Sequence, residues 1–434
     1  MAGYASARFQ RWSAILRLLG KVAQIGAKTL KIGLVWQSYY PWDVRIEKFA
    51  RALRDAGHEP YILSKKRPGQ EVREEVDGVA IRRFELTTFH TLDEILSYHF
   101  PFNIAWTKWL TRVVQADELN MLIVRDIPLF YPSYLVGRRL QIPVGLDMAE
   151  NYPAAVAAWG KSRLSHYFTR SYRLLKIVER VAVRRAAFVL VVTPVQVKRL
   201  TSQYGIASGK IVVVSNTPDL EVIQQVKSEV STEVRSTDDP VRIVYTGGLG
   251  PHRGIETLIR AVNILWSNGY SVRLRIIGSA HDMTYEERLR RLAKGLKLEN
   301  IVVFTGQVPH RVVYREIAAA DICVIPHLVS EHVNTTIPNK LFDYMGLGKP
   351  CVVSDAEPLK AIVLDAKCGL VFQSGDEGDV ARVLARLIDN PTERLVFGRN
   401  GAHAVQTRYN WEADKAQLLR VVGSYRSIST NVLG

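Results

Sequence analysis

The segment Tyr245-Thr246-Gly247-Gly248-Leu249-Gly250-Pro251-His252-Arg253-Gly254 decides how this chain folds around a ligand. An apolar, β-rich run (241–246) leads into it, and a helical pattern over 255–268 follows. Glycines let the backbone approach a ligand closely, and the start of the next helix offers free N–H groups and a positive dipole end. Arg253 adds a permanent cation whose planar fork suits phosphate oxygens. We therefore predict that Gly247, Gly248 and Arg253 bind an anion; a tight surface turn is the alternative.

A second segment, Ile337-Pro338-Asn339-Lys340-Leu341-Phe342-Asp343, starts a helix directly after a proline. Asn339 and Lys340 fall in the first turn of this helix, where an anion is stabilised. Asp343 lies four residues after Asn339, so both side chains project from one face. A carboxylate in that position can hold ribose hydroxyls, as acidic residues do in dinucleotide folds. The alternative is a capped helix with a solvated lysine and aspartate.

Around these segments, β-rich runs alternate with helical patterns from residue 30 to the end of the chain. A polar stretch over 221–240 interrupts the alternation. The pattern predicts an α/β fold of two Rossmann-like domains, with a ligand in the cleft where the carboxyl ends of their strands face each other. We divide the chain into a basic N-terminal helix (1–29), a first domain (30–220), a linker (221–240), a second domain (241–408) and a C-terminal helix (409–434).

Composition and charge narrow the classes of function. The 434 residues carry a net charge of +16, yet no helix-turn-helix, zinc-finger or RNP-type motif is present, so we expect no nucleic-acid partner. The sequence has no run of about 18 consecutive apolar residues, so we expect no transmembrane helix. The three cysteines are odd in number and lack metal-ligand spacing. We therefore expect a reducing, cytoplasmic environment, no disulfide framework and no bound metal.

The first 29 residues have no acidic side chain and several basic ones. Phe9, Trp12, Leu16 and Leu19 recur at spacings of three and four, which predicts one apolar stripe on a basic helix. Such a helix can lie in an anionic membrane interface. We expect residues 4–28 to hold the protein peripherally on the inner face of the plasma membrane; a helix packed on the protein's own surface is the alternative.

The two ligand-binding segments, in this order, resemble those of the retaining glycosyltransferases of family four, which have the GT-B fold. The resemblance extends over about residues 30–425 and is carried by an ordered set of loose motifs rather than by any single one. Besides the two segments already quoted, it rests on Tyr40-Pro41-Trp42-Asp43-Val44-Arg45, Val192-Thr193-Pro194, Ser215-Asn216-Thr217-Pro218-Asp219, Ile277-Gly278-Ser279, Phe304-Thr305-Gly306-Gln307-Val308-Pro309 and Tyr409-Asn410-Trp411-Glu412.

The resemblance implies roles for the donor-binding residues. Arg253 matches the basic residue that holds the donor diphosphate, whereas Gly248 stands where many members have an arginine. Asp343 matches the second acid of a paired motif that binds ribose, and Thr335 stands in place of the first acid. Lys340 is expected to replace the lost charge on the diphosphate. Four further positions fall in the loops near the base or in the second segment and complete the expected donor site: Gly278, Val308, Ile337 and Asn339.

The resemblance also places a His-Asp pair in the first domain, and this sequence departs from it. Ala149 stands in place of the histidine and Glu150 in place of the aspartate. Glu150 or Asp147 could still orient the acceptor or stabilise an oxocarbenium-like state. Asp126, at the end of the preceding strand, is the other candidate, unless it only caps a helix. The candidate catalytic residues are therefore Glu150, Asp147 and Asp126.

Together these features favour a retaining glycosyltransferase of hexosyltransferase type. It would move a sugar from a nucleotide-diphosphate donor to a glycan or lipid-linked acceptor in polysaccharide or glycoconjugate biosynthesis. Arg253 and Lys340 would stabilise the leaving diphosphate, so we expect no cofactor and no metal. Two alternatives remain open. One is a nucleotide-sugar epimerase of the same fold, and the other is a sugar-nucleotide-binding protein without catalytic activity.

Overall fold

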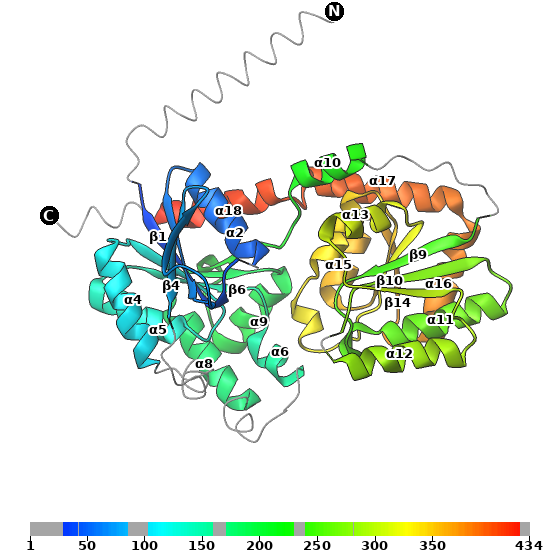
Figure 1. The fold of residues 1–434 in the computed structure, drawn as a ribbon, viewed down its shortest axis with the longest axis horizontal. Helices are drawn as coiled ribbons and strands as arrows, with labels where there is room; N and C mark the ends of the chain where they lie inside the picture. Colours follow the sequence, from blue (N-terminus) through cyan, green and yellow to red (C-terminus); the bar gives the residue numbers. More distant parts are fainter. Residues whose placement is uncertain are drawn as a thin grey trace, which may run out of the picture.

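The computed structural model describes residues 29–41, 43–85, 103–158, 171–229, 239–280 and 282–425. Two α/β domains lie side by side, one on the blue-to-green part of the chain and the other on the green-to-orange part (Figure 1). Each domain is built on a mainly parallel sheet covered by helices, which confirms the predicted fold class. The expected basic helix over 1–29 falls, except for its last residue, outside the described ranges.

The first domain contains an eight-stranded sheet in the order β3-β4-β2-β1-β5-β6-β7-β8. All neighbouring strands are parallel except β3 and β4. Residues 32–35 of β1 are all buried, because helices cover both faces of the sheet. The described strands are β1 (Lys31–Tyr39), β2 (Glu59–Lys65), β3 (Arg73–Val76), β4 (Val79–Phe84), β5 (Met121–Arg125), β6 (Val144–Met148), β7 (Val189–Val191) and β8 (Ile211–Val213).

Helix α2 shows how the first domain's helices are positioned. The Asp43 carboxylate accepts hydrogen bonds from the backbone N–H groups of Arg45 and Ile46 and so caps the helix. Its apolar face, which includes Phe49 and Leu53, is buried on the sheet. The helices of this domain are α2 (Val44–Asp55), α4 (Ile104–Ala116), α5 (Phe130–Leu140), α6 (Tyr152–Ala158), α8 (Tyr172–Arg185), α9 (Pro194–Tyr204) and the short η1 (Ser208–Lys210).

The second domain contains a six-stranded sheet in the order β11-β10-β9-β12-β13-β14, in which every neighbouring pair is parallel. The chain order reverses between β9 and β12. A reversal of this kind opens a crevice beyond the carboxyl ends of the two strands, where α/β sheets bind ligands. The strands are β9 (Val241–Thr246), β10 (Val272–Ile277), β11 (Val302–Gly306), β12 (Ile322–Ile325), β13 (Cys351–Ser354) and β14 (Gly369–Phe372).

Helices on both faces of the second sheet complete that domain (Figure 1). They bury a continuous apolar core that includes Ile259 and Val262 of α11 and Leu384 of α16. These elements are η2 (Pro251–Arg253), α11 (Ile255–Ser267), α12 (Met283–Gly295), α13 (His310–Ala318), η3 (Val333–Thr335), α14 (Asn339–Gly346), α15 (Glu357–Ala366), α16 (Glu377–Asp389) and α17 (Pro391–Thr407).

Two helices connect the domains. The polar stretch predicted as a linker begins with a helix, α10 (Leu220–Glu229), because Ile223 and Val226 are buried in the core of the second domain. The last described helix, α18 (Trp411–Ser424), crosses to the first domain and packs on α2 and β8 (Figure 1). There the Trp411 ring stacks 6.0 Å from the Phe49 ring. Within the described ranges, no helix combines the length and apolar composition that crossing a bilayer would require.

Candidate active site

A cavity of about 300 Å³ opens in the cleft between the two domains. It lies beyond the carboxyl ends of β5, β6 and β9, as expected for facing Rossmann-like sheets. The first domain contributes Arg125, Ala149, Glu150 and Asn216. The second domain contributes the glycine-rich loop, the loop after β12 and the start of α14, through Gly247, Gly248, Arg253, His327, His332, Val333, Thr336, Ile337, Pro338, Asn339 and Lys340.

The glycine-rich loop is held by close backbone contacts. Gly254 has a φ of 68°, and a Cβ atom at this position would lie 1.8 Å from the carbonyl oxygen of Pro326. Only glycine fits there. The contact lets the backbone N–H of Leu328 donate to the carbonyl oxygen of His252 at 2.9 Å. Gly278 is equally constrained, since its Cβ would lie 2.2 Å from the carbonyl oxygen of Gly247. Gly278 therefore supports the loop from behind, and the cavity lining does not include it.

Arg253 is oriented by a buried histidine. Its Nη1 atom lies 3.2 Å from Nε2 of His327, which is 2% exposed. A guanidinium can only donate, so Nε2 accepts and His327 is neutral. Burial, together with the nearby Lys340 and Arg253, holds the pKa of His327 well below its usual value, which favours this state.

Lys340 faces the same cavity from the first turn of α14. Its ammonium lies 4.0 Å from the centroid of the Tyr245 ring and contacts Gly247, where a Cβ atom would come within 2.6 Å of it. Burial and the neighbouring Arg253 lower the pKa of Lys340 well below its usual value. Neither Lys340 nor Arg253 forms an ion pair with a carboxylate among the described residues. Two cations and a helix N-terminus therefore converge on one cavity, and neither cation is paired with a described carboxylate, which is the arrangement of an anion-binding site.

Asp343 lies farther from the cavity than its position four residues after Asn339 predicted. Asn339 lines the cavity and Asp343 does not, although both lie on α14. The hydroxyl of Tyr314 lies 3.4 Å from Oδ1 of Asp343 and donates to it. Burial, partly offset by Lys48, raises the pKa of Asp343 to about 6. Its role as a ribose ligand stays a prediction, as does that of Val308, which packs beside the core of the second domain and outside the cavity lining.

Of the candidate acids, Glu150 lines the cavity and Asp147 does not. The Asp147 carboxylate is 3% exposed, and both of its oxygens accept from the guanidinium of Arg45, at 2.7–3.1 Å. Arg45 in turn donates to Oδ1 of Asn216 at 2.9 Å. In the structure Asp147 positions Arg45 and, through it, Asn216. A role for Asp147 in orienting the acceptor or stabilising an oxocarbenium-like state stays a prediction.

Asp126 also lies next to the cavity rather than in its lining. Its Oδ1 atom is 3.5 Å from Nη1 of Arg125, which does line the cavity. Asp126 does not cap α5, whose N-cap is Leu129. Burial, only partly offset by Arg125, raises the pKa of Asp126 to about 7. A catalytic role for Asp126 stays a prediction.

The two positions where the sequence departs from the expected pattern lie at the domain interface. Ala149 is buried in an apolar cluster with Val333 and Ile337 of the second domain. Thr335 donates its hydroxyl to the backbone of residues 331 and 332, and its carbonyl oxygen accepts from the hydroxyl of Thr193 at 3.0 Å. Both residues therefore hold the two domains together beside the cavity.

Eight lining residues were absent from the predicted site, among them His327, His332 and Asn216. Asn216 lies in a quoted motif, but nothing in its spacing shows that it reaches the cavity. His327 follows the buried strand β12 almost directly, so its place at a carboxyl strand end was a usable signal.

Comparison with known proteins agrees with this architecture. The family Glycosyl transferase 4-like domain matches residues 43–217, and the family Glycosyl transferases group 1 matches residues 226–404. Phosphatidyl-myo-inositol mannosyltransferase of Mycobacterium leprae is 29% identical over 181 residues, which are 42% of this chain and 45% of that protein. The chain spans between 45% and 60% of the length of three curated relatives that it matches.

Solved structures share the fold over nearly the whole chain. Sucrose-phosphate synthase from Thermosynechococcus elongatus superposes with a TM-score of 0.70 at 18% identity, covering 92% of this chain and 99% of that one. HepE of Anabaena in complex with UDP has a TM-score of 0.68 at 14% identity, covering 91% of this chain and 100% of that one. Because the two family matches together span both domains in the expected order, the chain belongs to the glycosyltransferases of family four, with the GT-B fold.

Proposed function

We propose that this protein is a retaining glycosyltransferase that takes a sugar from a nucleotide-diphosphate donor held in the interdomain cavity. The observation that carries the proposal is the convergence of Arg253, Lys340 and the N-terminus of α14 on a cavity where neither cation has a described carboxylate partner. A pyrophosphate supplies the missing negative charge. HepE of Anabaena, which has this fold, binds UDP and UDP-glucose, and this supports a nucleotide sugar as the ligand.

The same residues provide the chemistry of the transfer. As the bond from the anomeric carbon to the diphosphate breaks, negative charge grows on the leaving oxygen, and Arg253 and Lys340 stabilise it. An acceptor hydroxyl forms the new bond on the face that the diphosphate leaves and passes its proton to the leaving oxygen, so the configuration is retained. Glu150 lines the first-domain side of the cavity, which supports a role for it in stabilising the positive charge that develops on the sugar.

The proposed acceptor is a glycan or a lipid-linked sugar. A relative of this chain is named a phosphatidyl-myo-inositol mannosyltransferase, which supports a lipid-linked acceptor. The net charge of +16 agrees with an anionic substrate or with peripheral contact to an anionic membrane from the cytoplasmic side.

Donor binding and transfer can be tested separately. Calorimetry with UDP, GDP, ADP and their glucose and mannose derivatives should show binding by at least one of them, weakened more than tenfold by R253A. The variant E150Q should keep donor affinity and lose transfer to a crude lipid or glycan extract. If no nucleotide binds, the donor site is wrong. If E150Q transfers sugar at the wild-type rate, Glu150 has no role in the reaction. Donor turnover without any acceptor would favour the epimerase instead.

A further inference from the structure

A second cavity, of about 630 Å³, lies on the first domain between the β3–β4 hairpin and α4. In the order of the sheet, β2 and β1 separate β4 from β5, whose end carries the candidate active site. Three strand spacings put the two cavities roughly 15 Å or more apart. The second cavity is therefore a separate feature of the molecule, in the size range of small-molecule binding sites.

Arginines dominate the cavity lining. Arg73, Arg82, Arg83 and Arg112 are four of its nine lining residues, and no acidic side chain belongs to it. Two of the four are neutralised from outside the cavity. Arg82 makes a bidentate pair with Asp117, at 2.7 and 2.9 Å. Arg83 is the second neutralised arginine, through its ion pair with Glu74.

Arg83 is 2% exposed, and its Nη2 atom donates to Glu74 at 2.6 Å. Its Nε atom is buried and has no hydrogen-bond partner in the described part of the protein. A buried donor without an acceptor is costly, by about 1–3 kcal/mol. Arg73 and Arg112 are exposed and form no ion pair with a described carboxylate. The cavity thus has two cations without an ion-pair partner among the described residues, Arg73 and Arg112, and these favour an anionic ligand; the buried Nε atom of Arg83 is not exposed to the cavity.

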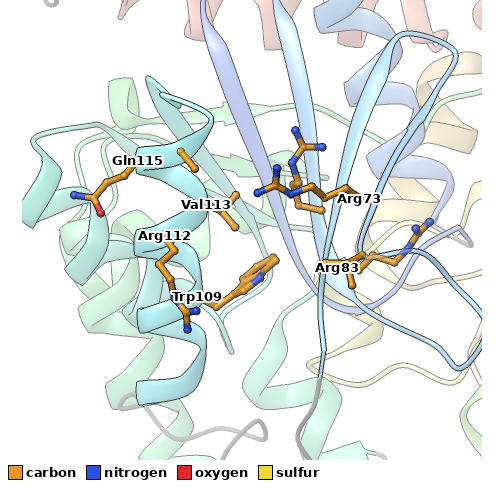
Figure 2. Close-up of a pocket in the computed structure, with 9 residues that line it drawn as sticks. Arg73, Arg83, Trp109, Arg112, Val113 and Gln115 are labelled. Carbon is orange, nitrogen blue, oxygen red and sulfur yellow. The ribbon is translucent and has the colours of Figure 1, made fainter.

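The opposite wall is apolar. Figure 2 shows Trp109 and Val113 on α4 pointing toward the strands that carry Arg73 and Arg83. The Trp109 ring is fixed in place because it packs against Phe84, with ring centroids 5.5 Å apart, and edge-on against Trp106 at 5.1 Å. A rigid indole beside arginine forks suits a ligand with a ring body and an anionic substituent.

We propose that this cavity binds an anionic saccharide, a sugar that carries a phosphate or a carboxylate group. The saccharide class follows from membership of a glycosyltransferase family, and the anionic substituent follows from the arginines. The sugar ring would lie on Trp109, with its phosphate or carboxylate between Arg73 and Arg112. The site would hold a part of an acceptor glycan distant from the reacting hydroxyl, or a separate charged sugar.

The test measures ligand binding to the full-length protein by calorimetry and by tryptophan fluorescence. The probes are glucose 6-phosphate, glucuronate, glucose and inorganic phosphate. Glucose 6-phosphate or glucuronate should bind saturably, and R73A/R112A should weaken that binding at least tenfold. Both arginines are exposed, so this variant should fold; R139A, which removes another exposed arginine of the same domain, is the matched control. W109F should abolish the fluorescence response and keep the aromatic packing.

Binding at this site should be independent of the donor site, so R253A should leave it unchanged whether or not R253A also abolishes nucleotide binding. Equal affinity of R73A/R112A and wild type for the charged sugars would overturn the proposal. So would equal affinity for glucose and glucose 6-phosphate, or for inorganic phosphate and glucose 6-phosphate. If the double variant loses binding to phosphatidylglycerol vesicles and no sugar binds, the surface is a membrane contact and the saccharide site is refuted.

Discussion

Replacing Lys340 with methionine removes one of the two cations of the proposed donor site and changes little else. Methionine keeps an unbranched chain of similar length, so contacts of the lysine stem with Tyr245 and Gly247 are largely preserved. Lys340 forms no ion pair with a described carboxylate, and the nearby Asp343 keeps its interactions with Lys48 and Tyr314 in the variant. The variant therefore isolates the interaction between the ammonium and the donor.

The expected loss of affinity follows from the opposite charges of Lys340 and the diphosphate. A hydrogen bond to a charged group contributes about 1.5–3 kcal/mol, and about 2 kcal/mol corresponds to a roughly thirtyfold change in Kd. The cation–π contact with Tyr245 is lost in the free and the bound protein alike, so it largely cancels. We expect K340M to weaken binding of the nucleoside diphosphate roughly thirtyfold.

The pH dependence of binding gives a second, sharper readout. Burial and Arg253 lower the pKa of Lys340 in the free protein. A bound diphosphate stabilises the ammonium and raises that pKa, so binding between the two pKa values takes up a proton. Affinity is then complete below the pKa of the free protein and falls as the pH rises through the window between the two values. K340M should remove this proton uptake.

Calorimetry in buffers of different ionisation enthalpy measures the affinity and the proton uptake together. K360M, which changes an exposed lysine of the same domain, is the control and should behave as wild type. If K340M binds the nucleotide within twofold of wild type across the pH range, Lys340 does not contact the diphosphate. If it weakens binding and leaves the proton uptake intact, another group titrates and the reasoning about Lys340 is wrong.

Three further variants test the supports of the site. H327L removes the acceptor that orients the donor arginine and should weaken nucleotide binding about five- to tenfold by calorimetry, whereas H327Q, which keeps an acceptor, should stay within threefold of wild type. G254A should lower the free energy of unfolding in urea by about 2 kcal/mol or more, since its Cβ meets a carbonyl oxygen, while G209A, with open space around it, should not. R45L leaves the buried Asp147 with only the longer ion pair to Arg125, at 3.8 Å, and should cost about 3–5 kcal/mol in the same assay; a loss below 1 kcal/mol would contradict the structural role of Arg45.

Helices and strands that are specified by residues close together in the chain could be predicted from the sequence. The strand, glycine loop and helix around residue 250 and the helix after Pro338 both follow from residues that are neighbours in the chain. The strand β3 gave no such signal, because all four of its residues are exposed and no face of it is apolar. Helix α10 was not predicted from the sequence for a related reason. Its sequence is mostly polar; Ile223 and Val226 are buried in the core, and Leu220 packs partly against it.

The same distinction separates the two halves of the candidate site. Gly247, Arg253 and Lys340 act from loops and helix starts whose geometry is set within about ten residues, and the structure brings them to one cavity. The positions of the acidic side chains of the first domain depend on residues that are far away in the sequence. Asp147 and Arg45 are 102 positions apart, and nothing in either local sequence shows that they pair.

That pairing fixes the charges beside the cavity on the first-domain side. With Asp147 committed to Arg45, and Arg45 to Asn216, the floor of the cavity on the first-domain side is an internally neutralised network. Glu150 is then the acid of this segment that faces the donor cations across the cavity. The proposed sugar donor would therefore meet Arg253 and Lys340 on the side of the leaving diphosphate, and Glu150 beside Arg125 on the side where positive charge would develop.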